Sequence, residues 1–90
     1  MSKAHVNPAE LRRFAQDLKR FNSELETLMH GLHSRLLNLE KTWDDQEQRK
    51  FMKEFEQSMR MLNRFLDSSG LHVPFLLKKA RLIEDYFQQH

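Results

Sequence analysis

The chain has 90 residues, of which 39% are hydrophobic and 31% charged, with two glycines and two prolines. This composition fits one small helix-rich domain over residues 1–90 and is too apolar for a disordered chain. The absence of cysteine excludes a disulfide framework, thiolate catalysis and a cysteine-ligated metal. The formal charge of +2 arises from interspersed basic and acidic residues, so no basic tail indicates nucleic acid.

The sequence contains no segment with the length and apolar character of a membrane span. The longest nearly apolar run, residues 71–77, is interrupted by His72 and Pro74. The first eight residues have no apolar core of the kind found in signal peptides. We therefore expect a cytoplasmic protein that would leave the cell, if it is secreted, by a leaderless route.

The first predicted helix spans residues 8 to about 40. Asn7 is the expected N-cap, and Pro8 suits the first helical position. Apolar residues then recur in steps of three and four, as in a coiled-coil seam: Leu11, Phe14, Leu18, Phe21, Leu25, Leu28 and Leu32. After these the phase shifts, and Leu36 and Leu39 continue the stripe. At ~1.5 Å per residue this helix is about 48 Å long, so it needs an equally long partner.

A polar turn, Thr42-Trp43-Asp44-Asp45, follows the first helix. Thr42 and Asp45 fit a start resembling a capping box, which predicts a second helix over residues 43 to about 67. Its apolar positions also have helical spacing: Phe51, Met52, Phe55, Met59, Leu62, Phe65 and Leu66. The two helices predict a hairpin with Trp43 at its elbow. The indole either packs between the helix ends or serves as an interface anchor.

A break in the second arm is expected between Asp67 and Val73. The segment Ser68-Ser69-Gly70 is typical of a helix stop, and Pro74 would cost a continuing helix ~3 kcal/mol. A kink is the alternative. A short third helix should follow over residues 74 to about 88, with apolar residues on two sides: Leu76, Ala80, Ile83 and Phe87, and beside them Phe75, Leu82 and Tyr86. The expected fold class is all-α, an antiparallel helical hairpin with a broken second arm.

Few polar residues have the spacing of a chemical site. His30 and His33 could ligate one metal, but two histidines on a polar helix flank are usually solvated. His30 and Ser34 have the spacing of a base and a nucleophile, yet no glycine-rich oxyanion loop accompanies them. We therefore expect no enzyme, and no catalytic residue, cofactor, metal or small-molecule substrate.

Basic residues flank the first helix near its start and the last predicted helix. They are Arg12, Arg13, Lys19 and Arg20, and Lys78, Lys79 and Arg81. Because Asp17 and Glu84 interrupt the two groups, solvated helix flanks are favoured over nucleic-acid binding.

A tryptophan in a turn between two long amphipathic helices, in a cysteine-free chain of this length, resembles the Trp-Xaa-Gly family of small bacterial type VII secretion substrates. These are also called early secreted antigenic target-like proteins. The turn motif comprises Trp43, Asp44 and Asp45, with Phe51 following near the start of the second helix; Asp45 stands where the family has glycine. Tyr86 is followed four residues later by His90, rather than by the acidic residue of the family's export signal.

The resemblance implies a hairpin that pairs with itself or a sister chain into a four-helix bundle, and that an ATPase-driven membrane machine exports. The first hypothesis is thus a non-enzymatic protein that acts as a homodimer or paralogous heterodimer and binds other proteins. The alternatives are an intracellular helical adaptor or regulatory subunit and, less favoured, a small nucleic-acid binder.

A dimer is also expected from the residues themselves, because one hairpin cannot cover both the long stripe and the two-sided last helix. The predicted interface draws on two groups of residues: Leu18, Phe21 and Leu25, or Leu76, Ile83 and Phe87.

Overall fold

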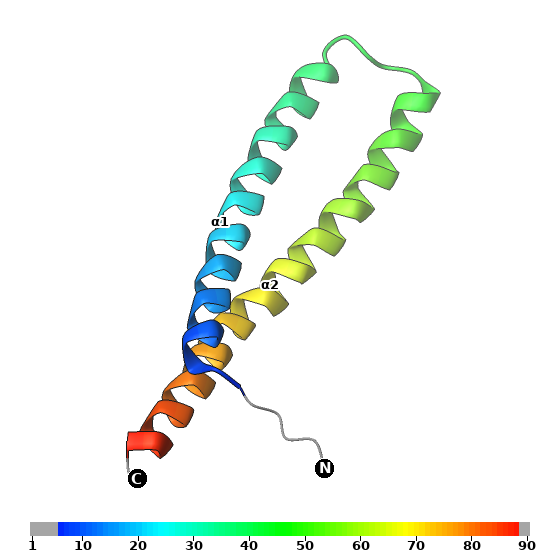
Figure 1. Ribbon diagram of the computed structural model, residues 1–90. Coiled ribbons are helices and arrows are strands. Elements are labelled where there is room, and N and C mark those ends of the chain that lie inside the picture. Colours follow the sequence, from blue (N-terminus) through cyan, green and yellow to red (C-terminus); the bar gives the residue numbers. More distant parts are fainter. Residues whose placement is uncertain (1–5, 89–90) are drawn as a thin grey trace.

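A computed structural model describes residues 6–88 of the chain. It consists of two antiparallel helices, α1 (Pro8–Leu39) and α2 (Gln46–Gln88), joined by a short elbow (Figure 1). Residues 6–88 contain no strand. The hairpin is long and thin, with Cα extents of 68 × 27 × 15 Å. The predicted all-α hairpin is therefore confirmed.

Helix α1 begins as its sequence predicts. The Asn7 side chain accepts hydrogen bonds from the backbone N–H groups of Ala9 (2.8 Å) and Glu10 (3.3 Å). These bonds satisfy two donors that the first helical turn leaves without partners, and Pro8 lacks the N–H that would be a third. The helix ends at Leu39, within the expected range.

The elbow has the predicted place in the chain, but α2 begins at a different residue from the one predicted. The Thr42 hydroxyl donates to the Leu39 carbonyl at 3.2 Å, so Thr42 completes the end of α1. The Asp45 carboxylate accepts from the backbone N–H of Gln48 at 2.8 Å, which makes Asp45 the cap of α2. Helix α2 consequently begins at Gln46, three positions later than the predicted start at residue 43.

The predicted break in the second arm and the short third helix are wrong. Helix α2 runs without interruption through Ser68, Gly70 and Pro74, and no residue from 6 to 88 has a positive φ. Pro74 is exposed, whereas Ser69 and Ala80 on either side of it are buried. The packing that orders both flanks outweighs the local preference for a stop, including the hydrogen bond that Pro74 removes and the clash of its ring with the carbonyl four residues earlier.

Small side chains form the closest part of the contact between the helices. Ala15 and Ala80 are fully buried, and Ser69 is only 2% exposed. The two ribbons lie closest in the half of the hairpin near the termini and diverge toward the elbow (Figure 1). Helix separation follows the size of the side chains at the contact, and the elbow half holds the stacked rings of Phe51 and Phe55.

Two polar contacts fix the register of the hairpin. The Ser69 hydroxyl donates to the Asn22 side-chain oxygen at 2.9 Å, in the middle of the contact. Near the termini, Arg12 donates two hydrogen bonds to the Glu84 carboxylate, one of them at 3.0 Å. Both contacts require the same antiparallel alignment of α1 and α2.

Candidate protein-interaction surface

The stripe predicted on the first helix divides into two faces. Leu18 and Leu25 are half-buried against α2, whereas Phe14, Phe21 and Leu28 are 57%, 50% and 70% exposed. The reason is geometric: a stripe in steps of three and four is wider than one contact line, and α2 covers only one of its edges. Half of the predicted seam is therefore left uncovered.

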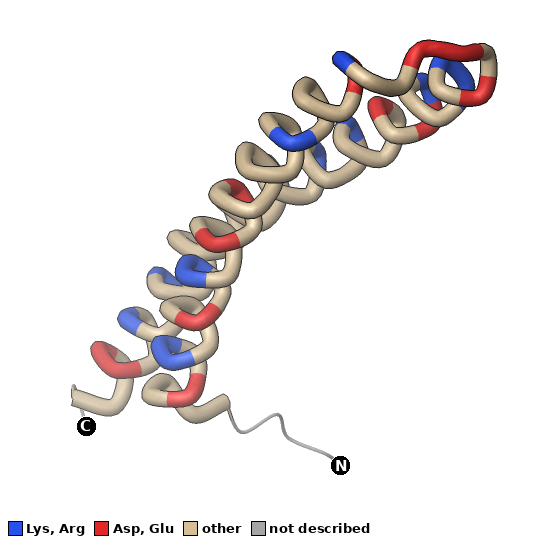
Figure 2. The backbone as a smooth tube through the Cα atoms, turned by 90° about the horizontal axis from the view of Figure 1, so that it is seen from above, with Lys and Arg blue, Asp and Glu red and all other residues tan. Residues whose placement is uncertain are grey.

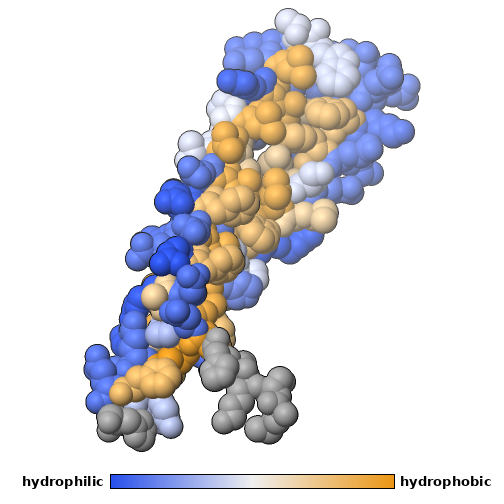
Figure 3. Space-filling model, in the orientation of Figure 1, coloured by the Kyte–Doolittle hydropathy of each residue, from blue (hydrophilic) through white to orange (hydrophobic). Residues whose placement is uncertain are grey.

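Helix α2 extends this uncovered surface. The Phe21 and Phe65 rings meet edge to face across the two helices, with centroids 6.1 Å apart. Figure 3 shows a continuous apolar strip along both helices on this side of the molecule. We call this surface the apolar band. Phe14, Phe65 and Phe75 line it together, and Phe21 contacts Phe65. By their helical spacing from these residues, the exposed side chains of Leu28, Leu32 and Met61 continue the band.

A shallow groove runs along the apolar band between the helices. Its walls are mainly aromatic and aliphatic, and its lining residues are Phe14, Leu18, Phe65, Ser69, His72, Phe75 and Leu76. An exposed groove of this kind can receive apolar side chains from a partner.

The structure brings the predicted turn motif together at the elbow. The Trp43 and Phe51 rings are 5.7 Å apart and inclined by 40°, and Trp43 is half-buried. Asp45 caps α2, while Asp44 is exposed and forms a long 3.4 Å ion pair with Arg49. The indole thus rests on the first turns of α2 and keeps part of its surface in water, which is compatible with both roles considered for it.

An ion pair between Arg12 and Glu84 joins α1 and α2 near the termini, at the open end of the hairpin. Hydrogen bonds from Arg12 lower the pKa of the Glu84 carboxyl below its ordinary value, and partial desolvation opposes this effect. The same contact raises the pKa of Arg12. Arg12 and Glu84 are 41% and 34% exposed, so the pair positions the helix ends more than it stabilises the fold.

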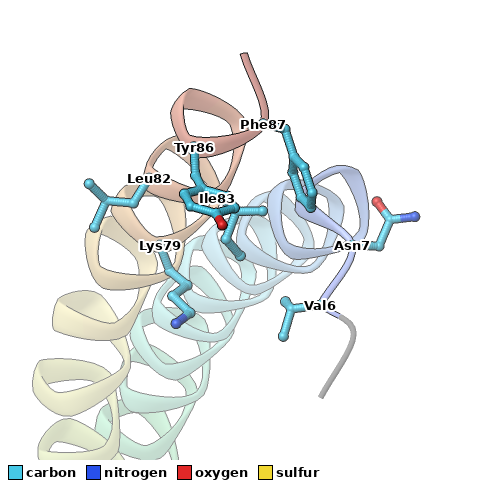
Figure 4. Close-up of a pocket in the computed structure, with 7 residues that line it drawn as sticks. All are labelled: Val6, Asn7, Lys79, Leu82, Ile83, Tyr86 and Phe87. Carbon is cyan, nitrogen blue, oxygen red and sulfur yellow. The ribbon is translucent and has the colours of Figure 1, made fainter. Parts of the chain in front are cut away.

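The remaining predicted interface residues lie at this open end. Leu76 and Ile83 are half-buried along the helix contact, and Phe87 is 65% exposed. Figure 4 shows an open cleft where the last turns of α2 meet the segment before α1, and Lys79 reaches its edge. The cleft is lined by Val6, Asn7, Lys79, Leu82, Ile83, Tyr86 and Phe87.

The histidines are not gathered into a metal site in the described part of the chain. No group of three or more His, Cys, Asp or Glu side chains that could hold a metal ion occurs there. His30, His33 and Ser34 are all exposed on α1.

Of the two residues at the positions of the family's export signal, Tyr86 is exposed on α2 and His90 lies outside the described residues.

Sequence patterning missed three residues of the helix contact: Ala15, Asn22 and Ser69. Ala15 is fully buried and lies seven residues before Asn22 on α1, and the Ser69 hydroxyl of α2 donates to the Asn22 side chain. The spacing is visible in the sequence, but alanine, asparagine and serine do not mark it as apolar.

Between residues 6 and 88, neither helix has an apolar stretch long enough to cross a membrane.

The geometry defines a class of small helical-hairpin proteins with an aromatic elbow and an uncovered apolar face. A family model described as "Proteins of 100 residues with WXG" matches residues 3–72, and the chain therefore belongs to this WXG100 family. The predicted resemblance is confirmed. Members of the family are small helical proteins that type VII systems secrete, are not known as enzymes and typically form dimers. Searches of the curated proteins and of the solved structures each found no significant match.

Proposed function

We propose that this protein works by pairing, with two hairpins packed face to face through the apolar band into a four-helix bundle. The partner is a second copy or a paralogous sister chain. The observation that carries this proposal is the exposure of Phe14, Phe21 and Leu28 in a continuous strip. Large contiguous apolar patches on soluble proteins usually mark interfaces.

The thinness of the hairpin supports the same proposal. Its buried apolar residues within 6–88 are Ala15, Leu36 and Ala80, and no large side chain there is fully buried. A contact of two helices offers little core to a chain of this size, and association is a common way to supply the rest. Pairing would place the Phe21 and Phe65 rings at the centre of the interface, where aromatic residues contribute most.

The proposed pair is tested by sedimentation equilibrium at micromolar concentration. The wild type should have about twice the chain mass of 10.9 kDa. Phe21→Glu should be a monomer with a lower Tm than the wild type, because a carboxylate at the centre of the band would be buried without a partner and the single hairpin has little core of its own. Leu37→Glu is the matched control: Leu37 is equally exposed at 50%, lies outside the band, and its variant should remain a dimer.

Two results would contradict the homodimer. A wild-type monomer that melts cooperatively would mean that the hairpin is stable alone. A Phe21→Glu variant that stays dimeric while Leu37→Glu dissociates would place the interface on the other side of the molecule.

We also propose, from family membership, that a type VII secretion ATPase recognises the protein and exports it. The match to the WXG100 family favours export over a purely intracellular adaptor. Expression in a bacterium with a type VII system should deliver the protein to the culture medium. Deletion of the ATPase gene should retain the protein in the cells, and unchanged release in that deletion strain would favour the adaptor.

A further inference from the structure

The hairpin brings together two basic segments that are far apart in the sequence. Because the helices are antiparallel, Arg12 of α1 shares one hollow with Lys78 and Arg81 of α2. Lys19 and Arg20 of α1 line the adjoining hollow, opposite Val73 and Leu77 of α2. Figure 2 shows Lys and Arg positions of both helices near the open end. Two adjoining hollows that share Leu77 connect these residues, and we call them together the basic groove.

The basic groove lies on a different side of the hairpin from the apolar band. On α1 it is lined by Arg12, Lys19 and Ser23, whereas Phe14 and Leu18 line the groove of the band. At about 3.6 residues per turn, these two sets project to opposite edges of the contact with α2. A partner on the band would therefore leave the basic groove open.

The charge of the groove is only partly neutralised. Arg12 is paired with Glu84, and Arg20 is paired with Asp17 at 2.9 Å. Lys19, Lys78 and Arg81 have no ion pair within residues 6–88. Glu24 is the one acidic residue in the lining of the two hollows. Lys19, Lys78 and Arg81 form the cationic rims of the groove. These rims favour an anionic partner.

The floor of the groove is apolar. Ala15 is fully buried, Val73 and Leu77 are half-buried, and the exposed Pro74 ring completes the surface. The lining has no aromatic ring on which a nucleic-acid base could stack. A concave floor between two cationic rims also suits a chain segment better than the flat surface of a membrane. These features together fit a peptide with both apolar and acidic side chains.

We propose that the basic groove binds an acidic amphipathic helix of another protein. Its apolar side chains would lie over Val73 and Leu77, and its carboxylates would face Lys19, Lys78 and Arg81. The family match ends at residue 72, so the α2 wall of the groove lies beyond it. A pair of hairpins joined through the apolar band would carry two such grooves, facing outward.

The test uses two fluorescent synthetic peptides that differ only in charge. Both are amphipathic helices with leucine at helical spacing, and their remaining positions are glutamate in one and lysine in the other. Fluorescence anisotropy with the full chain should show at least tenfold tighter binding of the glutamate peptide, and added salt should weaken it. Lys78→Glu combined with Arg81→Glu should reduce this binding at least tenfold.

The matched control makes the same charge change elsewhere on α2. Lys53 and Arg60 are exposed and lie outside the groove lining, so Lys53→Glu combined with Arg60→Glu should leave binding unchanged. Circular dichroism and sedimentation should show that both double variants remain folded and keep the wild-type mass. Loss of peptide binding with the mass retained would separate this proposal from the pairing of hairpins.

Three results would overturn the proposal. Equal affinity for the two peptides would mean that leucine alone drives binding. An equal loss of peptide binding in the control variant would mean that binding depends only on the net charge of the protein. Binding of anionic lipid vesicles or duplex DNA that depends on Lys78 and Arg81, with no binding of the glutamate peptide, would assign the groove to another class of partner.

Discussion

Replacing Pro74 with alanine tests whether α2 is truly continuous. Pro74 lies inside the helix and has no N–H to donate to the carbonyl of Gly70, four residues earlier. It is exposed, and an alanine there would keep the helical backbone while removing the ring. If the helix continues through this position, the substitution should stabilise the protein.

The size of the gain follows from two opposing terms. A proline in a helix interior costs ~3 kcal/mol relative to alanine. Replacing the proline also increases the conformational entropy of the unfolded chain, and this lowers the stabilisation by roughly 0.4–1 kcal/mol. The net stabilisation should be about 2 kcal/mol. For a domain of this size, that corresponds to a rise in Tm of roughly 8–16 °C.

The assay is thermal unfolding followed by circular dichroism, with all variants at one protein concentration because association shifts Tm. The second proline provides the control. Pro8 is at the first position of α1, where proline is favoured and no N–H is needed, so Pro8→Ala should change little or destabilise slightly. A Tm that falls in Pro74→Ala, or that rises equally in both variants, would refute the reasoning.

Three further predictions concern single contacts. Ser69→Ala removes the hydroxyl that bonds Asn22 and should lower the free energy of unfolding by about 1–2 kcal/mol, measured by urea denaturation; an unchanged midpoint would mean that water replaces the bond. The Glu84 pKa is lowered by Arg12, so this pair's contribution is present above the ordinary carboxyl pKa of 4.5 and is lost as pH falls through the lowered value. Glu84→Gln should therefore lose less stability than the wild type between pH 7 and 3, and parallel pH profiles would contradict this. Trp43→Ala should cost roughly 1–3 kcal/mol, less than a fully buried tryptophan, because the indole is half-buried; an unchanged Tm would leave the indole free for a partner.

Local signals predicted the first helix and the elbow well. Asn7 and Pro8 act within one turn of the chain, and their effect on α1 depends on no distant residue. Asp45 also acts locally, as the cap of α2. The capping-box pattern of Thr42 and Asp45 predicts Thr42 at the start of the second helix, whereas its hydroxyl bonds the last carbonyl of α1. The family was also recognisable, since Trp43 stands in the turn between the two helices.

The break near Gly70 was predicted wrongly because the decisive contacts are distant in sequence. Serine, glycine and proline each disfavour a helix locally, but Ser69 and Ala80 pack against residues of α1. Sequence patterns also could not divide the α1 stripe into a covered and an uncovered edge. Sequence patterns could not predict the basic groove either, because its two walls belong to different helices and meet only in the folded hairpin.

The contacts along the hairpin also imply an order of folding. Trp43 and Phe51 meet directly across the elbow, whereas Ser69 and Asn22 are 47 residues apart and Arg12 and Glu84 are 72 apart. The entropic cost of closing a loop grows with the separation of the contacting residues, so α1 and α2 should associate from the elbow toward the termini. Substitutions at the elbow should then slow folding, while those at the ion pair should mainly accelerate unfolding.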